Sequence, residues 1–201
     1  MKKISLILFF IILCSVSVSA QQLRVRVFSQ QKIKQTSFVP SFGRYSVEID
    51  GNLTRLSRTS NVKLSALNGK VEIRINDSVF ANSEKVTFKS EGIKSFFRLK
   101  PIAPEIAERR YDDALEVSVN GNGNLVLINI VEQENYIAGV VQSETWGATK
   151  NIDFFKVQAI CCRNYLFRNM NKHSKDGYHL CDDVHCQAYK TRANQAEVTE
   201  G

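Results

Sequence analysis

The sequence predicts an α+β fold in which a strand-rich part, about residues 22–131, is followed by helices and a polar loop. Three observations carry this prediction. Apolar residues recur with period two before residue 131, turn-forming residues separate these runs, and the apolar spacing becomes helical from Glu134 onward. The 201 residues, 43% of them apolar and 23% charged, suffice for one domain with a real core. This composition excludes a disordered, collagen-like or coiled-coil protein.

The strand-rich part opens with an alternating run in which Leu23, Val25 and Val27 form one apolar face. Further short runs are separated by turn-forming residues, and they cover residues 45–49, 71–75, 85–89 and 95–99. The last two runs, 115–119 and 125–131, flank a Gly/Asn-rich connection. Two apolar runs around such a connection indicate a β-hairpin.

Two helices are expected after the strands. The first covers residues 134–146, where Ile137, Val140 and Val141 have helical spacing. The second runs from about Asp153, a residue suited to an N-cap, to Met170. A polar loop rich in His, Cys and Asp follows at residues 171–189. The chain contains no repeat and no long linker, so we expect a single domain.

Glu144 lies on the apolar stripe of the first helix, because positions 137, 140 and 141 share its face. It also lies near the C-terminal end of that helix, where the helix dipole disfavours an anion. Partial burial and the dipole would both favour the protonated carboxyl, which a general acid for glycoside cleavage needs. The alternative is a side chain that turns to solvent or pairs with a lysine.

The polar loop contains Cys181 and Cys186, whose spacing fits metal ligands, together with all three histidines of the chain. Two thiolates and one imidazole would hold zinc and leave one position open or filled by water. The alternative is a disulfide between these cysteines, which is the default in an exported protein. The adjacent Cys161 and Cys162 fall within the second helix, and we expect both to be small buried core residues.

The first twenty residues have the pattern of a secretory signal peptide. Lys2 and Lys3 precede an apolar run, and Val18-Ser19-Ala20 suits cleavage after Ala20. The alternative is an uncleaved anchor helix, although the run is short for a membrane span. We therefore expect an exported protein of the periplasm, cell envelope or extracellular space, with no transmembrane segment after cleavage.

The charge of the chain favours anionic partners in the cell envelope. Loss of the two lysines in the signal would lower the formal net charge from +7 to about +5. Nucleic acid is not an expected partner, because the positive charges are scattered rather than gathered in a stripe.

Ordered blocks of the sequence resemble the SpoIID/LytB family, which comprises stage II sporulation protein D and the amidase enhancer LytB. The blocks are residues 111–119 (YDDALEVSV), 134–144 (ENYIAGVVQSE), 156–165 (KVQAICCRNY) and 181–189 (CDDVHCQAY). The resemblance implies one SpoIID-like domain over residues 21–201, with catalytic helices and a metal loop at 132–190. The family pattern continues beyond Gly201, so the domain is expected to be incomplete at its C-terminus.

The resemblance implies a lytic transglycosylase that cleaves peptidoglycan glycan, particularly strands stripped of stem peptides, to give 1,6-anhydromuramoyl ends. Glu144 matches the catalytic glutamate of the family and would serve as both acid and base. Lys156, Arg163 and Tyr189 match family positions and are expected to bind substrate. Lys156 and Arg163 could equally be structural ion-pair partners.

Cys181 and Cys186 also match the metal-binding cysteines of the family, with His173 as the third ligand and His185 as the second choice for that place. The zinc would be structural.

A second hypothesis for the function is a non-catalytic envelope factor that binds glycan and stimulates an N-acetylmuramoyl-L-alanine amidase. A third is an exported β-rich domain without chemistry. The process served stays open between sporulation, division and wall remodelling.

Overall fold

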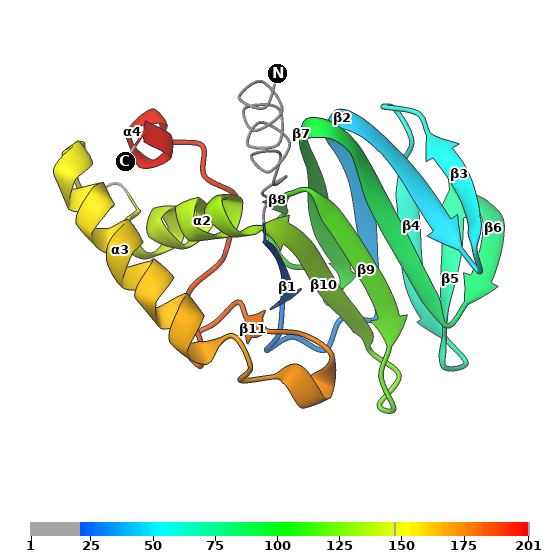
Figure 1. The fold of residues 1–201 in the computed structure, drawn as a ribbon. Coiled ribbons are helices and arrows are strands. Elements are labelled where there is room, and N and C mark those ends of the chain that lie inside the picture. The colour runs from blue at the N-terminus through cyan, green and yellow to red at the C-terminus, as the bar shows by residue number, and fades with distance from the viewer. Residues whose placement is uncertain (1–20, 147, 201) are drawn as a thin grey trace, which may run out of the picture.

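The structure is a computed structural model that describes residues 21–146 and 148–200 (Figure 1). The expected signal peptide, residues 1–20, lies outside the described residues. Within them, no helix is long and apolar enough to cross a membrane.

The strands of the described chain form one eleven-stranded sheet. Nine of them follow the order β11-β1-β10-β9-β7-β2-β4-β5-β6, and the other two pair beside this path, β3 with β2 and β8 with β7. Their bounds are β1 Gln22–Val27, β2 Gln35–Ile49, β3 Asn52–Leu56, β4 Val62–Leu67, β5 Lys70–Ile75, β6 Ser78–Ser83, β7 Lys85–Ala103, β8 Arg109–Asp112, β9 Ala114–Val119, β10 Leu125–Glu132 and β11 Leu180–Cys181. The expected hairpin is confirmed, because β9 and β10 pair antiparallel.

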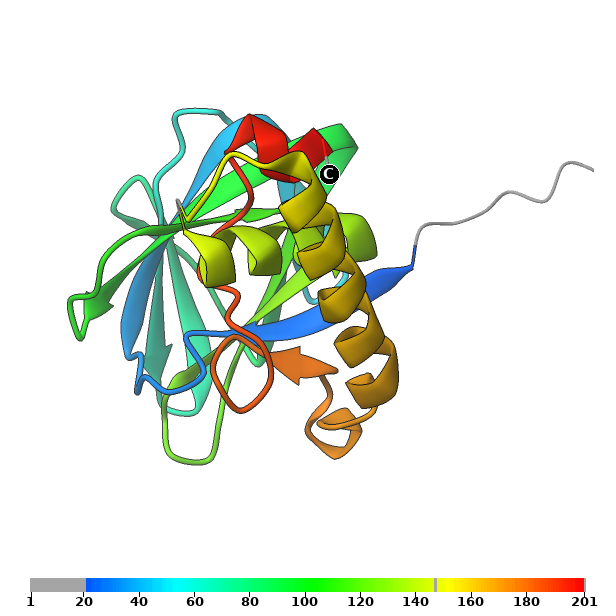
Figure 2. The same cartoon turned by 90° about the vertical axis from the view of Figure 1, so that its left-hand side faces the viewer.

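The helices follow strands β1 to β10 in sequence, as the α+β prediction expects, and the short strand β11 lies between η1 and α4. They are α2 Gln133–Thr145, α3 Ile152–Asn169, a short 3-10 turn η1 Ser174–Asp176, and α4 Ala196–Glu200. The N-cap of α3 is Asn151 rather than Asp153, because the Asn151 side chain accepts hydrogen bonds from the backbone N–H groups of Asp153 and Phe154. In Figures 1 and 2, α2 lies between α3 and the sheet, on the side away from β3–β6.

The long strands β2 and β7 replace the short runs expected at 45–49, 85–89 and 95–99. They stay paired along their length because register shifts near Pro40 and Phe42 allow the pair to bend. Gly43 lies at this bend with φ +80°, and a Cβ there would lie 2.1 Å from the Ser95 hydroxyl. The bend therefore requires glycine, both for its backbone conformation and for the close approach.

The sheet curls so that β5 also contacts β7 and β9, which encloses an aromatic core. Phe38 stacks on Phe88 with ring centroids 4.0 Å apart and on Phe97 at 4.9 Å. A second aromatic group joins the sheet to the helices, since Tyr189 lies 5.4 Å from Tyr111 and 5.0 Å from Tyr136. The core thus continues from the strands to the inner side of α2.

Candidate functional site

Glu144 occupies the last turn of α2. The stripe predicted for this helix is present, because Ile137, Val140 and Val141 are all buried. Glu144 itself is exposed, so the expected partial burial of its carboxyl is wrong. The reason is that α2 ends at Thr145, where the stripe leaves the core and faces α3. The helical spacing predicted the face of α2 on which Glu144 lies but not how exposed its side chain is.

One oxygen of the Glu144 carboxylate is held by α3. The Gln158 side chain donates from Nε2 to Glu144 Oε2 at 2.8 Å, and Cys162 Sγ lies 3.8 Å from the same oxygen. Burial, followed by the nearby Glu144 charge, raises the pKa of the Cys162 thiol to about 12, so this thiol keeps its proton and can donate it. Among the described residues no lysine or arginine pairs with Glu144. Of the alternative given for Glu144, the structure therefore shows the solvent-exposed side chain and not the pairing with a lysine.

The two adjacent cysteines of α3 differ in environment. Cys162 is buried against α2, as expected, but Cys161 is exposed on the outer side of the helix. The expectation that both are core residues is wrong for Cys161, because adjacent positions on a helix point about 100° apart.

Lys156 and Arg163 both form ion pairs, and neither reaches Glu144. Lys156 pairs with Asp153 at 3.3 Å on the exposed face of α3. Arg163 Nη2 lies 2.6 Å from Glu134 Oε2 and so links α3 to the first turn of α2. Of the two roles left open by the sequence, the ion pair is the one visible in the structure.

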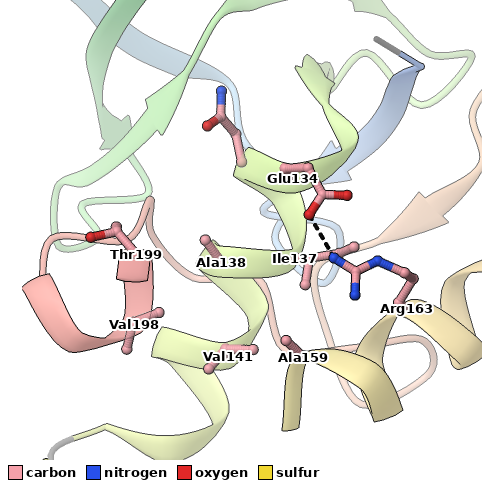
Figure 3. A pocket seen from close by; sticks show the side chains of 9 residues that line it. Glu134, Ile137, Ala138, Val141, Ala159, Arg163, Val198 and Thr199 are labelled. Carbon is pink, nitrogen blue, oxygen red and sulfur yellow. Dashed lines mark hydrogen bonds and ion pairs between the residues drawn. The ribbon is translucent and has the colours of Figure 1, made fainter. Parts of the chain in front are cut away.

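The pair between Arg163 and Glu134 borders a pocket of about 200 Å³ between α2, α3 and α4 (Figure 3). Its lining residues are Glu134, Asn135, Ile137, Ala138, Val141, Ala159, Arg163, Val198 and Thr199. Glu144 is not among them. It follows the pocket along α2, because Val141 on the pocket wall lies one turn before it. Arg163 therefore lies beside a hollow, while Glu144 stands beyond its edge.

Tyr189 is placed in the core rather than on the surface. Its side chain has no exposed area, and its hydroxyl donates to Asn129 Oδ1 at 2.9 Å. Gly139 of α2 lies directly against it, since a Cβ there would be 2.4 Å from Tyr189 Cε2. Tyr189 thus packs α2 against β10, and in this structure a surface ligand cannot touch it.

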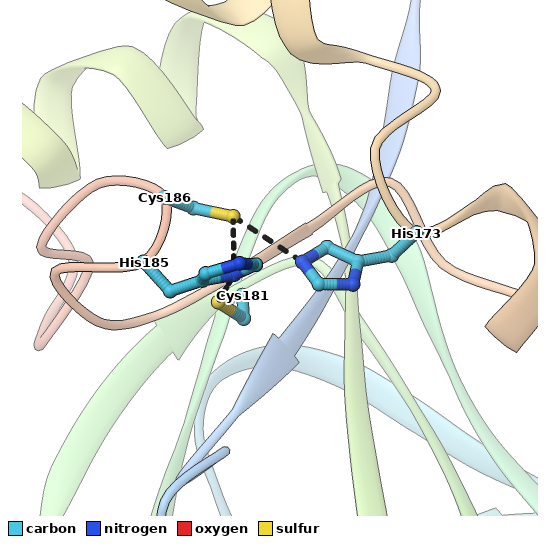
Figure 4. A group of neighbouring side chains, drawn as sticks. All are labelled: His173, Cys181, His185 and Cys186. Atoms are coloured by element: carbon cyan, nitrogen blue, oxygen red, sulfur yellow. Dashed lines mark hydrogen bonds between the residues drawn. The ribbon is translucent and has the colours of Figure 1, made fainter.

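The loop after α3 gathers a group of four possible metal ligands, His173, Cys181, His185 and Cys186, which we call the His/Cys cluster (Figure 4). Their ligand atoms all lie within 4.8 Å of one another. Cys186 Sγ is 3.4 Å from His173 Nε2, and His185 Nδ1 is 3.8 Å from both sulfurs. Tetrahedral zinc with ordinary Zn–S and Zn–N bonds separates its ligand atoms by about 3.6 Å. The cluster therefore fits a tetrahedral ion.

The cluster differs from the expectation in one ligand. His185 was only the second choice, yet it contributes beside His173, so the group has four donors instead of three. His179 lies elsewhere, because its Nδ1 accepts the backbone N–H of Arg24 at 3.0 Å. Cys181 and Cys186 are free thiols in the structure, not the alternative disulfide.

The loop that carries the His/Cys cluster is attached to the sheet through Asp182, a residue to which the sequence assigned no role. Asp182 is 1% exposed. It accepts hydrogen bonds from the backbone N–H groups of Phe28 at 2.8 Å and Ser29 at 3.0 Å, and pairs with Arg109 at 2.8 Å. Its position directly after Cys181 means that these contacts hold a cluster residue on the end of β1. The signal that the sequence offered was an aspartate directly after a candidate ligand cysteine.

Asp182→Ala is expected to lower the free energy of unfolding by about 3 kcal/mol, because it removes a buried carboxylate and leaves the partly buried Arg109 charge without its partner. Urea denaturation measures this difference. Asp183→Ala is the matched neighbour, since Asp183 is more exposed and pairs with Lys190 at 3.1 Å. That substitution should cost about 1 kcal/mol. Equal losses for the two variants would contradict the anchoring role of Asp182.

Comparison with known proteins agrees with the C-terminal part of this description. Residues 121–200 match the family model described as SpoIID, Stage II sporulation protein. No curated protein and no solved structure matches the chain. The matched segment contains Glu144 and the whole His/Cys cluster. Residues 121–200 are therefore similar to the SpoIID family.

Proposed function

We propose that this protein is a lytic transglycosylase that cleaves peptidoglycan glycan stripped of stem peptides, with Glu144 as the acid and base. The family match gives the chain a cell-wall-related role. The observation that supports the finer proposal is the state of Glu144, which is exposed and has one oxygen held by Gln158. An exposed carboxyl with a fixed orientation can meet a long polymer, which an enclosed pocket could not admit.

The reaction needs only one carboxyl group. Glu144 donates its proton to the glycosidic oxygen while the bond from that oxygen to C1 breaks. The C6 hydroxyl of the muramoyl residue that carries this C1 then bonds to C1 and gives its proton to the Glu144 carboxylate. The carboxyl group is thereby restored, and the product carries a 1,6-anhydro end. Because Gln158 binds Oε2, the proton that is transferred belongs to Oε1.

The His/Cys cluster is proposed to hold zinc through His173, Cys181, His185 and Cys186. Four protein ligands fill a tetrahedral site, so a zinc ion there would be structural and would leave no place for a catalytic water. It would join the end of α3 to β11. The His/Cys cluster would thus stabilise the fold, whereas Glu144 would carry out the cleavage.

The proposed place of action is the cell envelope, after export. The SpoIID family is associated with the cell envelope, and a basic protein is retained near anionic polymers. A cell-wall amidase is a possible partner, since it would produce the stripped strands.

Product analysis tests the proposal. The protein is incubated with glycan strands from which an amidase has removed the peptides, and the fragments are identified by mass spectrometry. Fragments with 1,6-anhydromuramoyl ends are expected. Fragments with reducing ends would instead indicate a hydrolase. Intact strands together with a stimulated amidase would support the non-catalytic envelope factor and reject the transglycosylase.

Gln158→Met is expected to lower kcat about tenfold and to leave KM nearly unchanged, because it removes the donor that orients Glu144 but keeps the length of the side chain. The kinetics are measured on stripped glycan fragments. A raised KM with an unchanged kcat would instead show that Gln158 binds substrate. Thermal unfolding serves as the control, since the Gln158 side chain is only partly buried and its replacement should not shift the melting temperature.

A further inference from the structure

A hollow of about 350 Å³ lies on the outer face of β7 and β8, away from the pocket between the helices. It is lined by Val39, Pro40, Ser41, Arg58, Phe96, Arg98 and Arg110. We call it the arginine pocket. All of these residues precede the segment that matches the SpoIID family, so nothing in that match accounts for them.

Two of its arginines face each other across the sheet. Arg98 on β7 is directly opposite Arg110 on β8 in the antiparallel register. Like charges in this position destabilise a strand pair. Arg58 adds a third positive charge from the connection between β3 and β4. An anion that lay against these three positive charges would relieve their mutual repulsion.

Little negative charge compensates these arginines. Arg98 lies 3.7 Å from Glu108, and both side chains are partly exposed. In the described part of the chain, no carboxylate is within 4.0 Å of a guanidinium nitrogen of Arg58 or Arg110. Arg98 also donates from Nε to the Ser41 hydroxyl at 3.1 Å, which fixes its direction. At least two guanidinium groups can therefore form paired hydrogen bonds with an added carboxylate.

An aromatic platform adjoins the arginines. Phe42 and Phe96 stack with their ring planes 8° apart and their centroids 6.0 Å apart, and Phe42 is 54% exposed. The Arg192 guanidinium lies 4.4 Å from the centre of the Phe96 ring. Exposed flat rings bind the apolar C–H face of a sugar ring. A phosphate polymer would use the arginines but would gain nothing from these rings.

We propose that the arginine pocket binds an anionic glycan, with a sugar carboxylate on Arg58 and Arg110 and a sugar ring on Phe42. This inference rests on the proposed function for its ligand. A glycan strand that has lost its stem peptides carries a free lactyl carboxylate on each muramoyl residue, whereas an intact strand has that group in amide linkage. The pocket would thus select stripped strands by charge, at a place separate from Glu144.

A binding experiment tests the pocket without cleavage. Glu144→Gln is the background, so that ligands stay intact, and calorimetry measures the Kd for a GlcNAc-MurNAc tetrasaccharide with free lactyl groups. Adding Arg58→Ala and Arg110→Ala should weaken binding about fivefold, since exposed arginine–carboxylate pairs each contribute modestly. Chitotetraose, which is neutral, should bind weakly to both proteins with an unchanged Kd.

The matched control removes two positive charges elsewhere, through Lys70→Ala and Arg168→Ala, which are both exposed. This variant should bind the acidic tetrasaccharide as the background does. Equal weakening by both double variants would show a general effect of net charge and would overturn the proposal. Tighter binding of poly(glycerol phosphate) than of the tetrasaccharide would overturn it in favour of a phosphate polymer.

Two further readouts separate the possible failures. Arg110→Ala should keep or raise the melting temperature, because it relieves the repulsion from Arg98, so lost binding cannot be explained by unfolding. Absence of cleavage by the unaltered protein, with charge-selective binding retained, would reject the transglycosylase but not the pocket. Normal cleavage, together with a Kd for the acidic tetrasaccharide that the two arginine substitutions leave unchanged, would reject the binding role of the arginine pocket but not the transglycosylase.

Discussion

Glu144→Gln is expected to reduce glycan cleavage by a factor of about 10²–10⁴, the usual contribution of a positioned general acid and base. The amide cannot give a proton to the glycosidic oxygen or accept one from the C6 hydroxyl. It can still accept the hydrogen bond from Gln158, which spans 2.8 Å in the unaltered protein, so the contact between α2 and α3 should persist. The release of 1,6-anhydro fragments from stripped glycan measures the loss.

Glu132→Gln is the matched control for this experiment. Glu132 is an exposed glutamate at the opposite end of α2, and its side chain makes no capping hydrogen bond. Its substitution removes the same charge at the N-cap position of α2 and should leave cleavage within about twofold, since surface changes of this kind cost little. Equal rates for the Glu144 variant and the unaltered protein would reject Glu144 as the acid.

Removal of zinc is expected to cost about 4 kcal/mol of stability when the free ion had been about a thousandfold above its Kd. The burial of the cysteine sulfurs explains why the protein should be less stable without zinc. Burial raises the pKa of the Cys186 thiol to about 11, so without a cation this thiol is protonated at neutral pH and contributes no charge to bind the loop. Thermal unfolding with zinc, and after treatment with a chelator, measures the difference.

Cys181→Ser should reproduce the effect of the chelator and abolish stoichiometric zinc in elemental analysis. Cys161→Ser is the matched control, because Cys161 is exposed on α3 and does not belong to the cluster. That protein should retain zinc and the melting temperature of the unaltered chain. A disulfide between Cys181 and Cys186 in the purified protein, with no bound metal, would contradict the zinc site.

Features that depend on neighbours in sequence could be predicted. The hairpin of β9 and β10 needs only two alternating runs and a turn, and the stripe of Ile137, Val140 and Val141 needs only helical spacing. The His/Cys cluster could also be predicted, because its residues fall within one loop. That His185 lies within reach of both cysteines was not evident from the sequence, which does not show the direction of a side chain next to Cys186.

Contacts between distant segments could not be predicted, because they depend on how the helices and strands pack. The exposure of Glu144 and its bond with Gln158 follow from the crossing of α2 and α3. The burial of Tyr189 follows from its place between α2 and β10. The opposition of Arg98 and Arg110 is a matter of strand register, which a shift of one residue would abolish.

The sequence by itself determined the α+β class, the similarity of residues 121–200 to the SpoIID family, Glu144 as a candidate acid and most of the His/Cys cluster, since periodicity and short motifs express local physics. Only the tertiary structure decided which oxygen of Glu144 is held, that Asp182 anchors the loop of the His/Cys cluster, and that three arginines line a pocket beside the exposed Phe42 ring. These features join residues that are far apart in the chain, and no local pattern encodes the distances between them.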